Sequence, residues 1–410
     1  MTRRLPLLVL GLAVAACDAS GPEAIPDPTP ITLTPLAKDL VVQSNQFGVD
    51  LFAQTAAEED DNLMLSPLSA SVALTMLLNG TDGETYAQIR DMLGYAESAD
   101  LAEINASYQS LSDQLLAADP KVQFTLANAV FSRQGFPFRD SFLHSMRDGF
   151  GARVEALDFT SPSALSTING WASDNTNGRV PRVLNELSPD LVMLLMNALY
   201  FKGDWTEQFE EANTASADFH LAGGETVQVP TMNGTIPALT ASGDGYTALE
   251  LPYGRRNFSM VVLLPDANAP GGLAEFAGVL RDGLWADATA QLDAQSQWRE
   301  VAVRLPRFRF SYETLLNSHL QALGMRDAFT GAADLSRMSD NARLLVSFVK
   351  QNTFVEVNEE GTEAAAVTTV GVEVTSAGPS FAADRPFVFA IRERTTNTLL
   401  FIGQVTHPAS

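Results

Sequence analysis

The sequence predicts a single large α+β domain extending from about residue 38 to residue 408. Three observations support this fold class: amphipathic helical patterns near the start of the domain, near-continuous apolar runs typical of buried strands further on, and neither an internal repeat nor a second linker. Hydrophobic residues make up 46% of the chain and charged residues only 18%, which suffices for a large core and excludes a mainly disordered chain.

Two helices are predicted near the beginning of the domain. Leu40, Ser44, Phe47 and Leu51 recur at helical spacing and lie on one face. Further on, Ser66-Pro67 is typical of an N-cap followed by proline in the first turn, and Asn79-Gly80 ends the helix that follows.

Strands are predicted in three places. Residues 191–201 form an almost unbroken apolar run, as expected of a strand buried on both faces, and residues 344–357 are a second candidate. Near the C-terminus, residues 387–391 and 399–405 are expected to form a buried hairpin that turns at Thr396-Asn397.

The first 16 residues predict an export signal. Arg3 and Arg4 precede an apolar run from Leu5 to Ala16, which is shorter than the roughly 20 residues that a membrane-spanning helix needs. Cys17, the only cysteine, follows directly and resembles the lipidated cysteine of a bacterial lipoprotein. We therefore expect an exported protein, either lipid-anchored through Cys17 on the periplasmic or cell-surface side of a bacterial membrane or, with an ordinary signal peptide, secreted and extracellular.

Residues 17–37 are predicted to be a proline-rich tether outside the fold. Five prolines occur between Asp18 and Pro35, and an extended proline-rich chain rises about 3.1 Å per residue, so these eighteen residues would hold a body roughly 50 Å from a membrane. The alternative is an N-terminus that is simply disordered.

Composition narrows the function classes. With 26 basic and 49 acidic residues the formal net charge is −23, which disfavours binding to nucleic acid and to anionic lipid surfaces. One cysteine excludes an internal disulfide framework and a cysteine-based zinc site. With only four histidines we expect no histidine-rich metal site, and we also expect no cofactor. No hydrolase elbow, zinc-protease helix, phosphate loop or dinucleotide fingerprint is present, so we expect no enzyme, although a catalytic set assembled from distant residues stays open.

Residues 361–378 form an unusual segment without proline, aromatic or basic side chains. Every second residue from Thr362 to Val372 is small or apolar, and Glu363 and Glu373 both fall on the other parity. A strand buries one parity and exposes the other, so this loop is patterned like a strand with one buried face. The alternative is a flexible surface loop, which does not account for the alternation.

Seven short motifs give the chain a resemblance to the serpins, a family of serine protease inhibitors. The resemblance runs in family order from about residue 38 to residue 408 and implies a large mixed central sheet, further sheets, about eight or nine helices and an exposed reactive-centre loop near residues 361–381. The motifs are Asn62, Ser66-Pro67, Ser69 and Gly80; Asn197 to Trp205; Leu305 to Phe308; Leu323 to Phe329; the hinge Glu359, Glu360, Gly361, Thr362, Glu363, Ala364, Ala365 and Ala366; Pro386 to Phe389; and Phe401 to Gly403.

One position departs from the family pattern. Serpins often carry a histidine in a buried polar cluster beneath the opening sheet, and here that position is Gln351. Glutamine still donates and accepts hydrogen bonds, but it provides no protonation switch near neutral pH. The resemblance implies a sheet-opening polar cluster made of Asn62, Ser66, Ser69, Asn197 and Gln351; the plainer interpretation is that these residues satisfy one another in the core.

The resemblance implies a suicide substrate of a serine endopeptidase. The protease attacks the loop, and the severed loop then inserts into the central sheet and traps the enzyme as a covalent acyl complex. Family spacing places the reactive bond at Thr375-Ser376, with Val372, Glu373 and Val374 beside it. Small uncharged residues suit an elastase-like or subtilisin-like protease. A shift of one or two residues would bring Val374 or Glu373 to the bond, and Glu373 would favour a Glu-specific protease.

Other partners are expected to be few. Residues 91–120 cover the helix that is basic in heparin-activated serpins but contain no Lys or Arg, so we expect no polyanion activation, and we expect a monomer that meets a membrane only through its lipid anchor. The alternatives are a non-inhibitory serpin that acts as a binding or chaperone-like module, an inhibitor of cysteine proteases, and a secreted hydrolase of unrelated mechanism.

Overall fold

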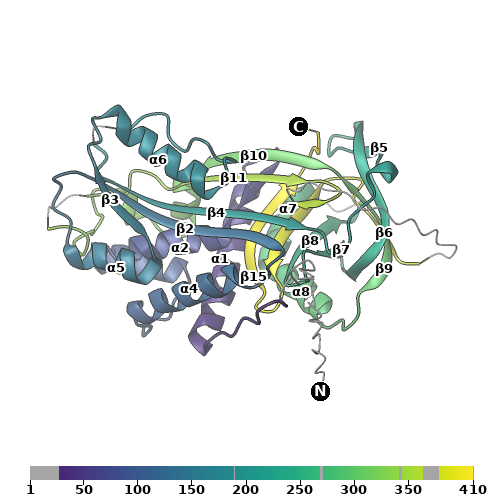
Figure 1. The fold of residues 1–410 in the computed structure, drawn as a ribbon, viewed down its shortest axis with the longest axis horizontal. Helices are drawn as coiled ribbons and strands as arrows, with labels where there is room; N and C mark the ends of the chain where they lie inside the picture. The colour runs from purple at the N-terminus through teal and green to yellow at the C-terminus, as the bar shows by residue number, and fades with distance from the viewer. Residues whose placement is uncertain (1–26, 189, 268–270, 341–343, 363–377, 410) are drawn as a thin grey trace, which may run out of the picture.

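The computed structural model describes residues 27–188, 190–267, 271–340, 344–362 and 378–409. Most of the helices precede residue 180 and most of the strands follow it (Figure 1). The α-helices of the described residues are α1 (Pro35–Ala56), α2 (Pro67–Leu78), α3 (Gly83–Met92), α4 (Leu101–Leu116), α5 (Asp140–Phe150), α6 (Pro162–Asn175), α7 (Gly272–Val279), α8 (Trp285–Asp293) and α9 (Asn317–Ala322). Shorter helices are the 3-10 helices η1 (Glu211–Asn213) and η3 (Asp327–Phe329) and the π-helix η2 (Leu280–Leu284).

The strands form two sheets. The six-stranded sheet has the order β10 (Phe308–Leu315), β11 (Lys350–Val357), β12 (Gly361–Thr362), β4 (Met193–Asp204), β2 (Val122–Arg133) and β3 (Arg153–Leu157). The nine-stranded sheet has the order β1 (Leu63–Leu65), β15 (Thr398–Val405), β14 (Phe387–Glu393), β8 (Phe258–Pro265), β7 (Tyr246–Pro252), β6 (Thr226–Gly243), β9 (Arg299–Pro306) and β13 (Ser380–Ala382), and β5 (Ala215–His220) pairs with β6.

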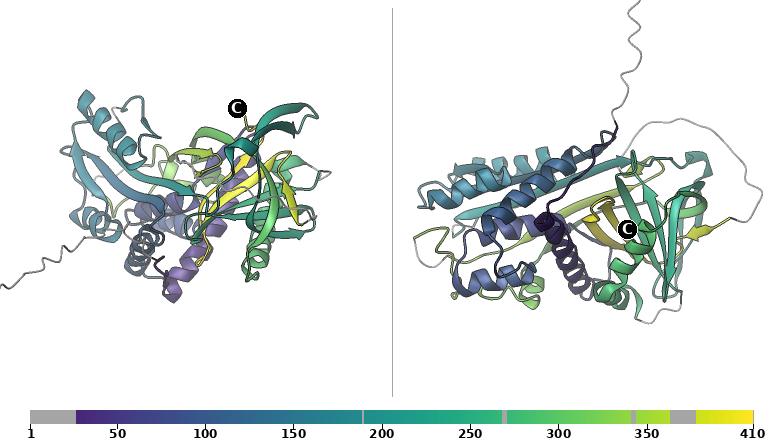
Figure 2. Two further views of the ribbon diagram at one scale, coloured as in Figure 1. Left: turned by 45° about the vertical axis from the view of Figure 1, so that its right-hand side comes forward. Right: turned by 90° about the horizontal axis from the view of Figure 1, so that it is seen from below.

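The two faces of the six-stranded sheet are covered differently. Helices α1, α2 and α4 lie on one side of it, and α6 lies on the other side (Figures 1 and 2). The larger hydrophobic core lies on the α1 and α2 side, and a smaller core lies beneath α6. Because β2 and β3 are parallel while the remaining pairs of this sheet are antiparallel, the predicted α+β class with a large mixed sheet is confirmed.

Local sequence signals explain two of the predicted elements. Ser66 caps α2 as predicted, since its hydroxyl accepts a hydrogen bond from the Ser69 amide and Pro67 stands in the first turn. The C-terminal hairpin β14–β15 turns where predicted, and Asn397 adopts the left-handed conformation that asparagine tolerates at such a turn.

The strand predicted at residues 344–357 is shorter in the structure and begins at Lys350. The preceding residues use their backbone groups elsewhere: the Val346 amide donates to the Ala328 carbonyl, and the Val349 carbonyl accepts from the Leu316 amide. The apolar run alone does not reveal these competing partners, so the predicted start was six residues too early.

Part of the predicted tether lies against the body. The Thr29 amide donates to the Ala118 carbonyl at 3.0 Å, and the Thr32 amide donates to the Gln114 side chain at 2.7 Å. Helix α1 begins at Pro35, three residues before the predicted start of the domain, and residues 17–26 lie outside the described residues. Among the helices that the structure describes, none combines the length and apolar character needed to cross a membrane.

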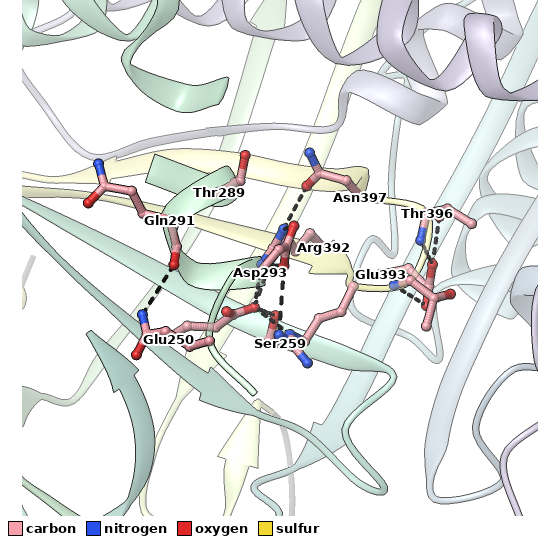
Figure 3. Close-up of polar contacts among 12 residues, drawn as sticks. Glu250, Ser259, Thr289, Gln291, Asp293, Arg392, Glu393, Thr396 and Asn397 are labelled. Atoms are coloured by element: carbon pink, nitrogen blue, oxygen red, sulfur yellow. Dashed lines mark hydrogen bonds and ion pairs between the residues drawn. The ribbon is translucent and has the colours of Figure 1, made fainter. Parts of the chain in front are cut away.

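A buried charge network fastens the C-terminal hairpin (Figure 3). The guanidinium of Arg392 is fully buried and bonds to Glu250, also fully buried, at 2.8 Å and to Asp293 at 2.7 Å. Burial lowers the pKa of Arg392, but the carboxylates of Glu250 and Asp293 outweigh it and hold that pKa above its ordinary value. Ser259 and Asn397 add hydrogen bonds, so the network ties β14 to β7, β8 and α8.

Candidate functional site: an open strand position in the six-stranded sheet

Strands β4 and β11 occupy neighbouring places in the sheet, but only two residues connect them. Gly361 pairs with Asp204 and Thr362 with Gly203 on β4, while Thr362 also pairs with Val357 on β11. Below this point, no backbone pairing joins β4 to β11 within the described parts of the chain. The sheet is therefore closed at one end by β12 and open along the remaining length of the two strands.

A cavity of about 440 Å³ lies at this opening. Residues 194–199 of β4 and residues 350–353 of β11 line its sides, and α2 and the segment between α6 and β4 contribute further walls. Strand β11 has Gln351, Thr353, Val355 and Val357 buried, and the residues between them are half-exposed. The opening thus has the two faces that a strand entering between β4 and β11 would meet.

Gly361 stands where β12 begins and has almost no space around it. A Cβ atom there would lie 2.1 Å from the Gly203 carbonyl oxygen and 2.7 Å from the Asp204 Cα atom. Its φ of 152° also disfavours other residue types. Glycine is therefore required for the chain to turn out of β11 and enter beside β4.

Thr362 is buried and faces the core. Its hydroxyl group is 2.6 Å from that of Tyr253, a fully buried residue whose ring stacks on Trp205 with centroids 4.4 Å apart. Burial raises the pKa of Tyr253 far above its ordinary value, so this hydroxyl stays protonated and available as a donor. The first residue of the hinge that follows Gly361 is thus already packed inside the sheet.

Glu359, the first residue of the hinge, is held in place by two side chains. It is buried, and its carboxylate accepts a hydrogen bond from Nε of Arg307 at 2.6 Å and another from the Thr214 hydroxyl. The carbonyl of Glu360 accepts from the Trp205 amide at 2.8 Å, and the indole Nε1 of Trp205 donates to the Asn358 carbonyl at 2.9 Å. These contacts fix the turn between β11 and β12.

The structure brings together some of the predicted polar cluster. The Gln351 side chain both accepts from the Ser66 amide and donates to the Ser66 carbonyl, each at 2.9 Å, and Ser69 is joined to Ser66 through the cap of α2. The Ser66 hydroxyl donates to the Leu400 carbonyl. Gln351 thus fastens the β11 side of the opening to α2 and β15 through neutral groups.

The other two predicted members lie elsewhere. Asn197, on β4, donates to the Asn128 side chain of β2 at 2.7 Å, and its own buried carbonyl oxygen has no hydrogen-bond partner among the described residues. Asn62 instead holds the C-terminal residues, because its side chain accepts from the amides of Thr406 and His407. The predicted cluster is therefore divided between the two sides of the opening, with Asn62 apart from both.

Sequence reasoning missed three residues of the site. Asn128 of β2, Tyr253 just after β7 and Arg307 between β9 and β10 contact Asn197, Thr362 and Glu359 respectively, and each pair is far apart in sequence. Only the family block that begins at Leu305 included one of them, and nothing in the sequence pairs them. Glu363, Ala364, Ala365 and Ala366, the bond Thr375-Ser376 with Val372, Glu373 and Val374, and Cys17 lie outside the described residues.

A large mixed sheet that helices cover on both faces, with a short hinge strand between β4 and β11, defines the fold class of this protein. The family model for serpins, described as serine protease inhibitors, matches residues 42–408, and the chain belongs to the serpin family. The prediction of that family from the sequence motifs is thereby confirmed.

Three similar proteins illustrate the relationship. Iripin-3 from Ixodes ricinus is 35% identical over 90% of this chain and 94% of its own length. Leukocyte elastase inhibitor from Sus scrofa is 34% identical over 90% of this chain and 100% of its own. The native-state crystal structure of tengpin, a thermophilic serpin, is 30% identical, covers 93% of this chain and 97% of its own, and has a TM-score of 0.79.

The prediction that the chain is not an enzyme needs correction as it was drawn. It rested on catalytic motifs missing from the sequence, whereas the family that the chain belongs to is described as serine protease inhibitors and one relative is named leukocyte elastase inhibitor. The chain is therefore characterised by its family of protease inhibitors, and not by the catalytic motifs that its sequence lacks.

Proposed function

We propose that this serpin inhibits a serine endopeptidase as a suicide substrate, through insertion of its severed loop between β4 and β11. The register of β12 carries the proposal. Gly361 pairs with Asp204 and Thr362 with Gly203, so each later residue meets the residue one place earlier on β4. Continued in this register, residue 363 meets Lys202 and residue 372 meets Met193, where β4 begins. The loop thus has the length that the open position requires.

Side-chain size supports the same insertion. Thr362 faces the core, so residues of the same parity, from Ala364 to Val372, would face the core after insertion, and all of them are small or apolar. About ten or more new backbone hydrogen bonds, at ~0.5–1.5 kcal/mol net each, contribute on the order of 10 kcal/mol. The intact protein is then held by a kinetic barrier that cleavage of the loop removes.

We place the reactive bond at Thr375-Ser376 from family spacing. Small uncharged residues before the bond favour a protease with a shallow apolar specificity pocket, of the elastase or subtilisin type. A relative named leukocyte elastase inhibitor, 34% identical over 90% of this chain, supports this class of target. No Lys or Arg occurs between Gly361 and Asp384, which disfavours a trypsin-like protease.

The test mixes the purified protein with pancreatic elastase, subtilisin, trypsin and papain, and looks for detergent-stable complexes on a denaturing gel. We expect a covalent band with elastase or subtilisin and none with trypsin, and mass spectrometry of the released C-terminal fragment identifies the bond. A band with papain alone would indicate a cysteine-protease inhibitor. Cleavage by all four proteases without any complex would contradict the inhibitory function and favour a binding module.

We also propose that the protein is exported and lipid-anchored through Cys17 to a bacterial membrane. The support is the order of basic residues, short apolar run and single cysteine at the start of the chain. When the full chain is expressed in a bacterium, it should partition into the detergent phase, and Cys17→Ser should move it to the aqueous phase. Equal partitioning of the two proteins would contradict the anchor.

A further inference from the structure

The connector that follows α6, residues 176–188, crosses the outer face of the open strand position. Asn169 of α6 holds this connector at one side, since its side chain accepts from the amides of Val183 and Leu184 and donates to the Leu184 carbonyl. Val180, Val183 and Leu184 line the cavity together with β4 and β11. The connector therefore forms a cover over the position that the loop would enter.

Lys350 fastens this cover to the far side of the opening. Its Nζ donates to the Val183 carbonyl at 2.8 Å and pairs with the Glu313 carboxylate of β10 at 2.7 Å. The Lys350 side chain is only 15% exposed, so these contacts are partly shielded from water. Because Val183 is anchored to α6 and Lys350 begins β11, this hydrogen bond spans the opening.

Arg179 makes a second contact between the connector and β11, nearer the hinge. Its guanidinium lies 4.9 Å from the centre of the Phe354 ring and 3.8 Å from the Glu356 carboxylate, both on β11. Two residues earlier in the connector, Asn177 donates to the Tyr200 hydroxyl of β4 at 3.3 Å. The connector thus contacts both strands that border the opening.

The strand register predicts which loop residues would meet the contacts of Lys350 and Arg179 after insertion. Val357 pairs with Thr362, so continued pairing would set residue 365 beside Phe354 and residue 369 beside Lys350. Both residues have the parity opposite to Thr362 and would face the connector. They are Ala365 and Thr369, so the loop carries small side chains where the cover crosses its path.

We propose that Arg179 and Lys350 are positioning residues that hold the connector over the open strand position and set the rate at which a strand enters. The inference rests on the strand insertion proposed above. An entering strand has to displace or lift a cover that is bonded to β11, so each crossing contact adds to the barrier. Loss of one contact of this size is expected to speed entry about three- to tenfold.

The chain offers matched controls on one side of the opening. Arg309 of β10 contacts the same partners as Arg179, lying 5.5 Å from the Phe354 ring centre and 3.7 Å from the Glu356 carboxylate. Glu313, also on β10, shares the Lys350 ammonium with Val183. Arg309→Met and Glu313→Gln therefore remove similar interactions without touching the connector.

The experiment measures uptake of a synthetic acetylated peptide of residues 363–374 by the intact protein, followed as a shift on native gels. Arg179→Met and Lys350→Met should each take up the peptide about three- to tenfold faster than the parent, and the double variant should approach the product of the two factors. Lys350→Arg, which keeps a donor, should return to within about twofold of the parent. Thermal unfolding midpoints of all variants separate this effect from general destabilisation.

Uptake by Arg179→Met and Lys350→Met that is no faster than uptake by Arg309→Met and Glu313→Gln would overturn the inference. If Lys350→Met folds poorly, the comparison of Arg179→Met with Arg309→Met still decides it. A parent protein that takes up no peptide at all would instead contradict strand insertion, so failure of the proposed function is distinguished from failure of this inference.

Discussion

The β14–β15 hairpin and the β4–β11 opening differ in how completely their strands are paired, buried and hydrogen-bonded. Every residue of β14 and β15 is buried, both strands have neighbours on each side, and the fully buried Arg392 is bonded to two carboxylates. At the opening, the described ladder between β4 and β11 ends at Thr362, and a buried oxygen of Asn197 lacks a partner among the described residues. One region is saturated with contacts, whereas the described pairing of the other is incomplete, as the proposed insertion of a strand requires.

The largest effect is expected from a substitution in the hinge. Thr362→Arg places a charge beside Tyr253 in the core, where an unpaired ion is strongly unfavourable. We expect cleavage by the target protease to continue while covalent complex formation falls by at least about tenfold, because a slower insertion loses to deacylation.

The control for this variant is Thr362→Ser, which keeps the hydroxyl near Tyr253 and should retain complex formation. Stoichiometry of inhibition, read from titration of residual protease activity, measures both variants. Complex formation by the Arg variant at the parental rate would show that Thr362 does not lead the insertion.

In the β14–β15 hairpin, Arg392→Met should destabilise the fold without changing the proposed inhibition of the protease. The substitution leaves the buried Glu250 carboxylate facing Asp293 without Arg392 between them, although Arg394 still contacts both. Breaking such a buried pair costs about 3–5 kcal/mol in unfolding free energy.

Denaturant unfolding measures this loss, and the stoichiometry of inhibition of the surviving folded protein should stay at the parental value. A variant as stable as the parent, or one that fails as an inhibitor while fully folded, would contradict the division of roles between the two regions.

The pair Arg307–Glu359 joins the fixed body to the hinge, and its loss should have an intermediate effect. Arg307→Met leaves the buried Glu359 carboxylate with the Thr214 hydroxyl as its remaining described side-chain donor. We expect a loss of about 1–3 kcal/mol in native-state stability. We also expect faster spontaneous passage to a form that no longer inhibits.

Incubation at moderate temperature followed by activity titration measures that passage. Arg307→Lys, which keeps the charge but not the guanidinium geometry, should fall between the parent and the methionine variant. If both variants keep their activity as long as the parent, the pair does not restrain the hinge.

The smallest expected effect comes from the Tyr253 hydroxyl. Tyr253→Phe removes one hydrogen bond to Thr362 but keeps the stacking on Trp205. The native state should lose about 1 kcal/mol, and the cleaved, inserted form should lose a similar amount. Thermal unfolding of both forms checks this, and an unchanged native midpoint would show that Thr362 is not held by this contact.

The sequence predicted local features well and distant contacts poorly. The Ser66 cap and the Asn397 turn follow from chemistry within a few residues, and both appear in the structure. The early residues of the predicted strand at 344–357 were wrong because α9 and η3 compete for their backbone groups. The contacts of Tyr253 with Thr362 and of Arg307 with Glu359 join residues 109 and 52 positions apart, which no local pattern encodes.

The central claim is that a severed loop enters the opening between β4 and β11 and completes the sheet. The most direct measurement compares the thermal unfolding midpoint of the intact protein with that of protein nicked once in the loop. The nicked form should unfold at a markedly higher temperature, since insertion adds on the order of 10 kcal/mol of backbone hydrogen bonding. Equal midpoints, or a lower midpoint for the nicked form, would contradict insertion and leave only the fold and the family.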